Sequence, residues 1–386
     1  MRKNLVFAGA AFAASLAILI AQPAVASTAH GAGGEHGFHG AGGHHGTAPK
    51  PDPFACSANV DAVSFSDALD KKIVDGAEVS GLSSIAWDAR QQAWVSALDN
   101  NGLTPEYVWS YRNLSAPKVT HAPLVLTKPN GTPYDGTTAD NEGLAVLPDG
   151  DYLVSSETEP SIRIYGRNGV QKASLPVPAR FAVTGTTPLG EATGNATLEG
   201  LTITPNGKTI VASMEGALSG DVSKSGDASA HRLLVYTQGR HGAWQLEKQI
   251  EYRTDTGMRI PEVAAYSNDA VVVEEANWTA TTGNLVKLFA VTGLSRAADV
   301  SHVKDLGAAS PRLAVTKTLL ADLTSCPTLG ATALEFQQNP LLDNFEGMAV
   351  TGKLPGKDEY GVSLISDDNN SAAQHTRILN LKVKLP

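Results

Sequence analysis

The sequence predicts an all-β protein built as a β-propeller, and two observations lead to this prediction. The first is a hairpin signal: over residues 140–157 an apolar run, a Pro-Asp-Gly turn and a second apolar run follow one another and end at a carboxylate. The Gly after Asp accepts the positive φ that such a tight turn requires. The second is repetition of this unit about every sixty residues, which is typical of radially repeated blades.

Five copies of the hairpin unit are visible. They begin at Ser80, Glu142, Glu199, Glu262 and Glu346; the first has Ser in place of the leading Glu, and the copy at Glu262 is the most divergent. A third strand follows in each copy, and four antiparallel strands make one propeller blade. We therefore expect five four-stranded blades, or six if residues 293–344 contain a degenerate copy.

Residues 1–26 have the pattern of a secretion signal. Arg2 and Lys3 provide the positive start, residues 5–20 the apolar run and residues 24–26 the small-residue cleavage site. The alternative is a membrane anchor, but the apolar run is short for a membrane span. We expect a secreted protein, extracellular or periplasmic, whose mature form does not span the membrane.

Residues 27–55 form a His-, Gly- and Pro-rich segment that contains half of the ten histidines of the chain. Such a composition cannot bury a core, so we expect a flexible linker. The alternative role is loose capture of transition metals by the imidazoles. The folded domain is then expected over residues 56–386.

The charge of the chain limits its partners. The formal net charge is −9, and removal of Arg2 and Lys3 with the signal changes it to −11. This acidity argues against nucleic acid or an anionic membrane as a partner. We expect a small-molecule partner and a monomeric protein.

The two cysteines, Cys56 and Cys326, lie near the start of the folded domain and before its last repeat. In a propeller the two ends of the domain meet in one closing blade, so these positions can be neighbours. An even number of cysteines in an exported protein favours a disulfide. We expect this bond to join the N-terminal segment to the closing blade; the alternative is two separate buried thiols.

Acidic residues recur at the same places in the repeat. If each first strand lines the central channel, its leading Glu and the acid that ends the next strand face the same mouth. Carboxylates gathered in this way repel one another unless cations neutralise them, and oxygen-only ligands suit Ca²⁺. The alternative is that each acid bonds backbone amides within its own repeat. The predicted metal ligands are Asp99, Glu142, Glu157, Glu199, Glu215, Glu262, Glu346 and Asp367, with Glu274 or Glu275 as a further candidate.

Basic residues occur in the predicted third strands. These residues are Arg163, Arg232, Lys287 and Arg377. They could neutralise the acidic ring or bind an anionic substrate, and the alternative is that they are solvated charges on the blade faces. We assign the predicted catalytic roles to Glu142, Glu199, Glu346 and Arg232.

With these residues identified, the chain from about residue 81 to residue 385 resembles the phytase-like family, described by an "esterase-like activity of phytase". The resemblance rests on a series of motifs in the same order and with similar spacing. They include Gly81-Leu82-Ser83, Asn141-Glu142-Gly143-Leu144, Leu198-Glu199-Gly200-Leu201, Met214-Glu215-Gly216, Asn344-Phe345-Glu346-Gly347 and Ser366-Asp367-Asp368-Asn369. One departure is at Glu274-Glu275-Ala276, where the family has Glu followed by Arg.

The resemblance implies a phytase-like propeller over residues 56–386 that hydrolyses phosphate or carboxylic esters with calcium. We therefore expect a secreted, metal-dependent ester hydrolase that acts at a carboxylate-lined channel mouth. One alternative is a non-catalytic, calcium-stabilised propeller that binds a ligand or a protein, and another is a lactonase-type hydrolase. A phytase also needs several Lys or Arg beside the calcium, because phytate is a dense polyanion, and this chain has few at motif positions.

Overall fold

The structure is a computed structural model that describes residues 52–99, 102, 104–239 and 242–386. The predicted secretion signal, residues 1–26, and the linker up to residue 51 lie outside the described residues. The fold described here is that of the unit Pro51–Pro386.

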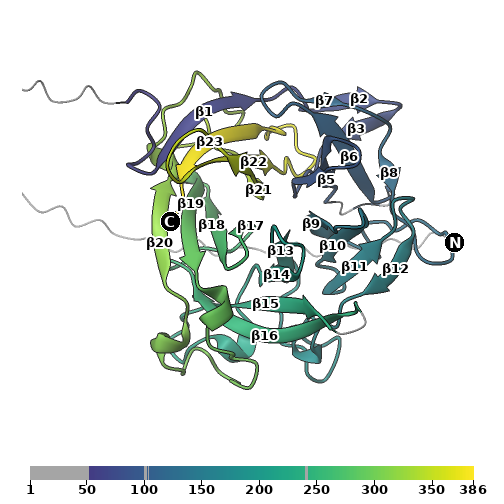
Figure 1. Ribbon diagram of the computed structural model, residues 1–386, viewed down its shortest axis with the longest axis vertical. Coiled ribbons are helices and arrows are strands. Elements are labelled where there is room, and N and C mark those ends of the chain that lie inside the picture. The colour runs from purple at the N-terminus through teal and green to yellow at the C-terminus, as the bar shows by residue number, and fades with distance from the viewer. Residues whose placement is uncertain (1–51, 100–101, 103, 240–241) are drawn as a thin grey trace, which may run out of the picture. The chain divides into compact units, whose positions relative to one another are not determined.

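Five antiparallel sheets are arranged around a common centre as the blades of a propeller (Figure 1). Blade 1 contains β4 (Ala86–Asp88), β5 (Ala93–Ala97), β6 (Tyr107–Arg112) and β7 (Lys118–Val119), and the short strand β8 (Leu124–Val125) also pairs with β6. Blade 2 contains β9 (Asn141–Val146), β10 (Tyr152–Ser156), β11 (Ser161–Tyr165) and β12 (Gln171–Ser174). Blade 3 contains β13 (Leu198–Ile203), β14 (Thr209–Met214), β15 (Ala230–Gln238) and β16 (Trp244–Arg253).

Blade 4 contains β17 (Val263–Ser267), β18 (Ala270–Thr279), β19 (Gly283–Thr292) and β20 (Lys317–Asp322). Blade 5 contains β21 (Phe345–Lys353), β22 (Glu359–Ser366), β23 (Ile378–Lys384) and β1 (Val60–Ser66). A hairpin of β2 (Lys72–Val74) and β3 (Ala77–Val79) precedes blade 1. The helical elements of the described residues are five 3₁₀ turns: η1 (Ala179–Phe181), η2 (Ser219–Asp221), η3 (Leu294–Arg296), η4 (Pro311–Leu313) and η5 (Leu323–Ser325).

The ring is closed by the two ends of the domain. β1, the first strand of the chain, pairs antiparallel with β23, the last, from Val60–Val383 to Ser66–Ile378. The inner strands β4, β9, β13, β17 and β21 contact one another in this order, and β21 returns to contact β4. The predicted closure of the propeller by its two ends is therefore confirmed.

Apolar side chains are buried between neighbouring blades. Five separate hydrophobic clusters occupy the five blade-to-blade junctions, such as Val211 and Val235 of blade 3 with Val271 and Val273 of blade 4. Because each blade is covered by apolar side chains on both faces, its strands have long buried runs. The polar positions of the inner strands are then restricted to the ends of the channel.

The blade count is five, the lower of the two numbers that the repeats allow. The segment 293–344, which could have contained a sixth blade, supplies only β20 and the 3₁₀ turns η3, η4 and η5. The prediction of an all-β propeller with four-stranded blades is confirmed.

Cys56 and Cys326 form a disulfide, as predicted, across a sequence separation of 270 residues. Cys56 precedes β1 of blade 5, and Cys326 directly follows η5 at the end of blade 4. The bond therefore ties the N-terminal end of the closing blade to blade 4, whereas we expected it to join the N-terminal segment to the closing blade itself.

Replacing both cysteines by Ala should lower the free energy of unfolding by about 2–5 kcal/mol, because the unfolded chain regains the freedom of a long closed loop. The measurement is urea denaturation of wild type and of the Cys56→Ala/Cys326→Ala double variant under non-reducing conditions. Equal unfolding midpoints would contradict the role of this bond in holding the ring closed.

Candidate functional site

An acid follows the second strand in blades 1, 2, 3 and 5, and in blade 4 the acid Glu274 lies within that strand; all five acids have the same backbone contact. The N–H of Glu157 donates to Asp140 O over 2.9 Å, and the N–H of Glu215 donates to Thr197 O over 2.8 Å. The amides of Asp99, Glu274 and Asp367 make the corresponding bonds to the carbonyls of Gly81, Glu262 and Asn344. One acid from each of the five blades therefore occupies an equivalent place at the same edge of the propeller.

The Glu-Gly pairs of the inner strands coincide with β-bulges. The pairing register shifts by one residue at Glu142-Gly143 of β9, at Glu199-Gly200 of β13 and at Glu346 of β21. A bulge re-aims the side chain of the extra residue and is common beside functional sites. It brings these glutamates to the mouth that the second-strand acids already surround.

The glycines after these glutamates let the neighbouring inner strands pack closely. A Cβ at Gly143 would lie 2.5 Å from Glu199 O, one at Gly200 would lie 2.7 Å from the Cα of Glu262, and one at Gly347 would lie 2.6 Å from the carbonyl carbon of Ser84. Each neighbour belongs to the next inner strand or to the segment leading into it. The repeated Glu-Gly thus serves both the site and the closure of the ring.

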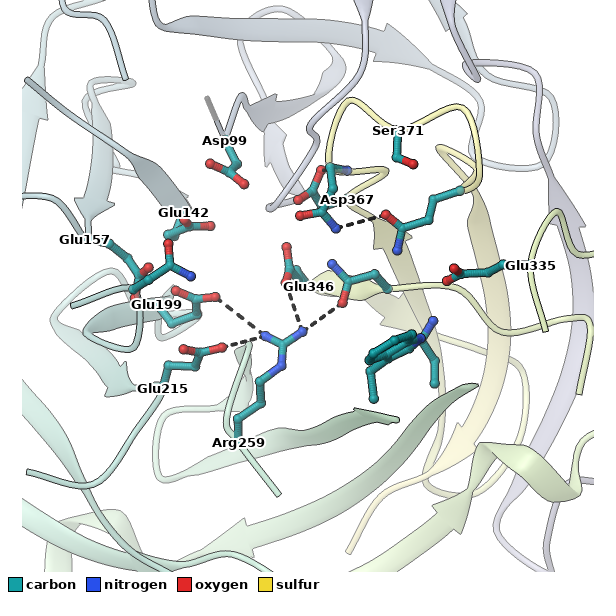
Figure 2. A pocket seen from close by; sticks show the side chains of 16 residues that line it. Asp99, Glu142, Glu157, Glu199, Glu215, Arg259, Glu335, Glu346, Asp367 and Ser371 are labelled. Atoms are coloured by element: carbon teal, nitrogen blue, oxygen red, sulfur yellow. Dashed lines mark hydrogen bonds and ion pairs between the residues drawn. The ribbon is translucent and has the colours of Figure 1, made fainter. Parts of the chain in front are cut away.

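The channel mouth is a cavity of about 450 Å³ (Figure 2). Its lining is unusually acidic, and Arg259 is the single cationic side chain among the lining residues. The acidic lining residues are Asp99, Glu142, Glu157, Glu199, Glu215, Glu335, Glu346 and Asp367. Seven of the eight predicted metal ligands therefore meet in one cavity.

Two groups of carboxylates lie close enough to share a cation. One is Asp99, Asp140 and Glu142, and the other is Glu142, Glu157 and Glu199; within each group one ligand oxygen per residue lies within 4.8 Å of the others. Glu142 belongs to both groups. Oε2 of Glu199 is buried without a hydrogen-bond partner in the described part of the protein. This side of the cavity, which we call the Glu142 side, has the arrangement expected of a site for a hard cation.

Burial raises the pKa of several carboxyl groups at this mouth. Burial and the charges of Glu199 and Asp99 hold the pKa of Glu142 well above its usual range. Burial and the charge of Glu215 raise the pKa of Glu157 to about 8, although the amide of Thr197 acts in the opposite direction. Without a cation, some of these groups are therefore protonated at neutral pH.

Arg259 neutralises the opposite part of the cavity. Its Nη1 donates to Glu215 Oε1 over 2.8 Å, and its Nη2 donates to Asn344 Oδ1 over 2.8 Å and to Glu346 Oε1 over 2.9 Å (Figure 2). The sequence predicted that cations must balance the ring but did not identify this residue. Arg259 lies before β17, outside the repeat motifs, and its backbone pairs with that of Ala276 in both directions. A positive charge is therefore present beside the Glu274-Glu275-Ala276 position.

Blades 1 and 4 lack a glutamate at the position that Glu142 occupies in blade 2. In blade 1 the hydrogen bond from Asp99 N to Gly81 O places Ser83, rather than Ser80, at the position of Glu142. In blade 4 the bond from Glu274 N to Glu262 O places Glu262 at the position of Asp140, and the register shows no bulge there.

Glu262 is the predicted ligand that does not line the cavity. Its Oε1 accepts from the amide of Val263 in its own blade over 2.8 Å and from the amide of Leu201 in blade 3 over 2.7 Å. The backbone-bonding alternative that the sequence left open, bonding within the same repeat, therefore describes only one of its two bonds. Glu275 also lies outside the cavity lining, and its carboxylate accepts hydrogen bonds from Tyr252 and Lys317. Glu274 is fully buried, and neither of its carboxyl oxygens has a hydrogen-bond partner among the described residues.

The basic residues of the third strands also lie outside the cavity. Arg232, to which we assigned a catalytic role, is buried in blade 3 and donates to Asp221 over 2.6 and 2.8 Å. Arg163, Lys287 and Arg377 pair with Glu159, Asp255 and Asp67. The third strand is separated from the channel by the two inner strands of its blade, so these side chains stabilise the blades from further out.

The fold and the cavity define a five-bladed propeller with a carboxylate-lined pocket at one mouth of its channel. The profile of a family described as "Phytase-like: Esterase-like activity of phytase" matches residues 77–370, so the chain belongs to the phytase-like family. No curated protein matches the chain.

Several solved structures are similar to the chain at low identity. Virginiamycin B lyase from Staphylococcus aureus has 8% identity and a TM-score of 0.34, with 79% of this chain and 67% of that chain covered. A protein of unknown function from Dyadobacter fermentans has 12% identity and a TM-score of 0.38, with 85% and 100% covered. A putative gluconolactonase has 9% identity and a TM-score of 0.36, with 76% and 71% covered.

Replacing Gly143 by Ala should lower the free energy of unfolding by about 1–3 kcal/mol, because the added methyl group meets backbone atoms that cannot easily move away. The measurement is urea denaturation. Gly194→Ala is the matched control: its Cβ meets only Val183 Cγ1, at 3.6 Å, and its stability should stay within about 0.5 kcal/mol of wild type. Equal losses in both variants would contradict the close approach of the inner strands.

Without divalent cations, the protein should become less stable as the pH rises from about 5 to 8. The folded protein holds protons on Glu157 and its neighbours that the unfolded chain releases near pH 4.5, so the free energy of unfolding falls over this interval. The measurement is melting in EDTA at both pH values. Burial lowers the pKa of His231, which acts in the opposite direction, so the control is Glu157→Gln, in which the fall should be smaller. A fall of the same size in that variant would contradict the assignment.

Proposed function

We propose that this protein is a metal-dependent ester hydrolase that binds Ca²⁺ on the Glu142 side of the cavity. The observation that carries the proposal is the pair of carboxylate groups that share Glu142, with ligand oxygens within 4.8 Å of one another. The family to which the chain belongs is described by an esterase-like activity, which supports the reaction class.

The donor atoms on this side fit calcium. They are carboxylate oxygens, and neither His nor Cys lines the cavity in the described part of the chain. Calcium takes six to eight oxygen ligands in flexible geometry, whereas imidazole and thiolate favour zinc and other transition metals. The buried Oε2 of Glu199, which has no hydrogen-bond partner in the described structure, is accounted for by a bound cation.

The side chains of the cavity then have distinct roles. Glu142 would hold the ion, either with Glu157 and Glu199 or with Asp99 and Asp140. When bound, a divalent cation polarises a carbonyl or phosphoryl oxygen and favours attack by water. Glu346 lines the same cavity and is oriented by Arg259, so its carboxylate is fixed where it can face a bound substrate.

The charge of the cavity favours an uncharged substrate. Eight acidic side chains line it against one arginine, and that arginine already donates to Glu215, Glu346 and Asn344. An anionic substrate such as a phosphate ester would be repelled by like charge. We therefore propose carboxylic esters, lactones included, ahead of phosphate esters as substrates.

We also propose that the protein is exported. The disulfide between Cys56 and Cys326 supports this, because such bonds persist in oxidising compartments. Among the described residues, no helix has the length and hydropathy to cross a membrane.

The test of the proposed metal is the melting temperature of wild type and of Glu142→Gln with EDTA and with calcium. Calcium should stabilise the wild type, by about 2.7 kcal/mol at a hundredfold excess over Kd, and should have a much smaller effect on Glu142→Gln. Glu159→Gln is the matched control, because the Glu159 side chain is 80% exposed and pairs with Arg163 rather than lining the cavity. No effect of calcium on the wild type would contradict the proposed metal.

The test of the reaction is hydrolysis of p-nitrophenyl acetate, a lactone, p-nitrophenyl phosphate and phytate in calcium. We expect turnover of the first two and its loss in Glu142→Gln and in EDTA. Stabilisation by calcium without turnover of any of the four would favour a non-catalytic, calcium-stabilised propeller.

A further inference from the structure

The structure points to a second cation position in the cavity, which the protein fills with its own guanidinium. Four side-chain oxygens surround Arg259. Oε1 of Glu215, Oδ1 of Asn344 and Oε1 of Glu346 lie 2.8–2.9 Å from its terminal nitrogens, and Oε1 of Glu199 lies 3.8 Å from Nη1. These oxygens come from blades 3 and 5 and surround the same guanidinium group.

This set of oxygen atoms resembles the set of possible metal ligands on the Glu142 side. Both combine oxygens from the bulged glutamates of the inner strands with oxygens from acids that follow second strands. Each set also includes the residue two positions before a bulged glutamate, Asp140 in one and Asn344 in the other. The difference is the occupant, because blade 4 has no Glu-Gly bulge, and the segment that leads into it supplies Arg259 instead. Calcium accepts carboxylate and side-chain amide oxygens of this kind.

Glu274, a buried acid close in the sheet to the backbone of Arg259, provides a second, independent observation about this position. Glu274 is fully buried, and both of its oxygens lack hydrogen-bond partners in the described residues. Burial holds the pKa of Glu274 well above its usual range, while the charge of Arg259 acts in the opposite direction. A buried carboxyl group with no hydrogen-bond partner is unfavourable in its charged form, and the positive charge of Arg259 offsets part of that cost.

We propose that Arg259 acts as a built-in cation that excludes a divalent ion from the Glu215–Glu346 position, and that its removal opens an additional calcium site there. The guanidinium is the better occupant for a permanent role, because it stays charged and its planar donors fit several acceptors at once. Divalent ions are thereby restricted to the Glu142 side. How many calcium ions the wild type binds depends on the proposed function. The additional site in the variant without Arg259 does not depend on it.

The experiment counts bound calcium by isothermal titration calorimetry and equilibrium dialysis for wild type, Arg259→Gln and Arg259→Lys. Arg259→Gln should bind one more calcium ion per chain than wild type. Arg259→Lys keeps the positive charge and should retain the wild-type number. Lys382→Gln is the matched control for charge, because it frees Asp61 from a 2.7 Å ion pair on blade 5, outside the cavity, and should leave the number unchanged.

An unchanged number in Arg259→Gln, or an added ion in Arg259→Lys, would overturn the inference. If wild type binds no calcium but Arg259→Gln binds one ion, the proposed function fails and this inference stands. If neither binds calcium, both fail.

A second measurement covers the case in which Arg259→Gln does not fold. In the wild-type background, Glu142→Gln should weaken calcium binding by roughly tenfold to hundredfold or more, the range for loss of a group that supports a metal. Glu215→Gln should change it by less than about threefold, because that side chain is bound to Arg259 rather than to the ion. Equal weakening in the two variants would overturn the inference.

Discussion

Repulsion among carboxylates at the channel mouth is the constraint on which the rest of this structure depends. Eight acidic side chains line one cavity, and burial raises the pKa of most of them. Such a group is unfavourable unless other interactions hold it in place. The five hydrophobic clusters between the blades, the pairing of β1 with β23 and the disulfide supply that support from outside the channel.

The site is asymmetric although the scaffold is nearly symmetric. The five second-strand acids have equivalent backbone contacts, but in the described part of the chain bulged glutamates occur only in blades 2, 3 and 5. Blade 1 has Ser83 at this position, and the inner strand of blade 4 has no bulge there. Arg259 lies at the gap left by blade 4, between acids of blades 3 and 5. The loss of one motif in the repeat therefore divides the mouth into a side that needs a cation and a side that already has one.

The sequence predicted most of the fold because the repeat has a strong local signal. Alternating apolar runs, Asp-Gly and Asn-Gly turns and the Glu-Gly pairs gave the blades, their hairpins and the edge at which the acids meet. The cysteine pair followed from the closure of a ring. The repeat features depend on short stretches of chain, so they can be derived without knowledge of long-range contacts. The disulfide spans 270 residues and could be predicted only because the repeats implied a closed ring.

The sequence misplaced side chains relative to the cavity where their position depends on the strand register or on the tertiary fold. Glu262 was aligned with Glu142, but the inner strand of blade 4 has no bulge at its start, where blades 2, 3 and 5 have theirs, so Glu262 turns to backbone amides instead. Arg232 was placed near the site, but its strand is third from the channel axis. Arg259 has no motif at all, because a loop residue reaches the site only through the tertiary fold.

The charge of the mouth also bears on the direction of the proposed reaction. Even with one divalent cation bound, carboxylates outnumber positive charges among the residues that line the cavity. An uncharged ester or lactone enters such a field without a penalty, whereas hydrolysis turns it into a carboxylate that the same field repels. The acidic lining would therefore weaken product binding more than substrate binding. A phosphate ester carries its charge from the start, so the same field would oppose its entry, and this asymmetry separates the two substrate classes within one family.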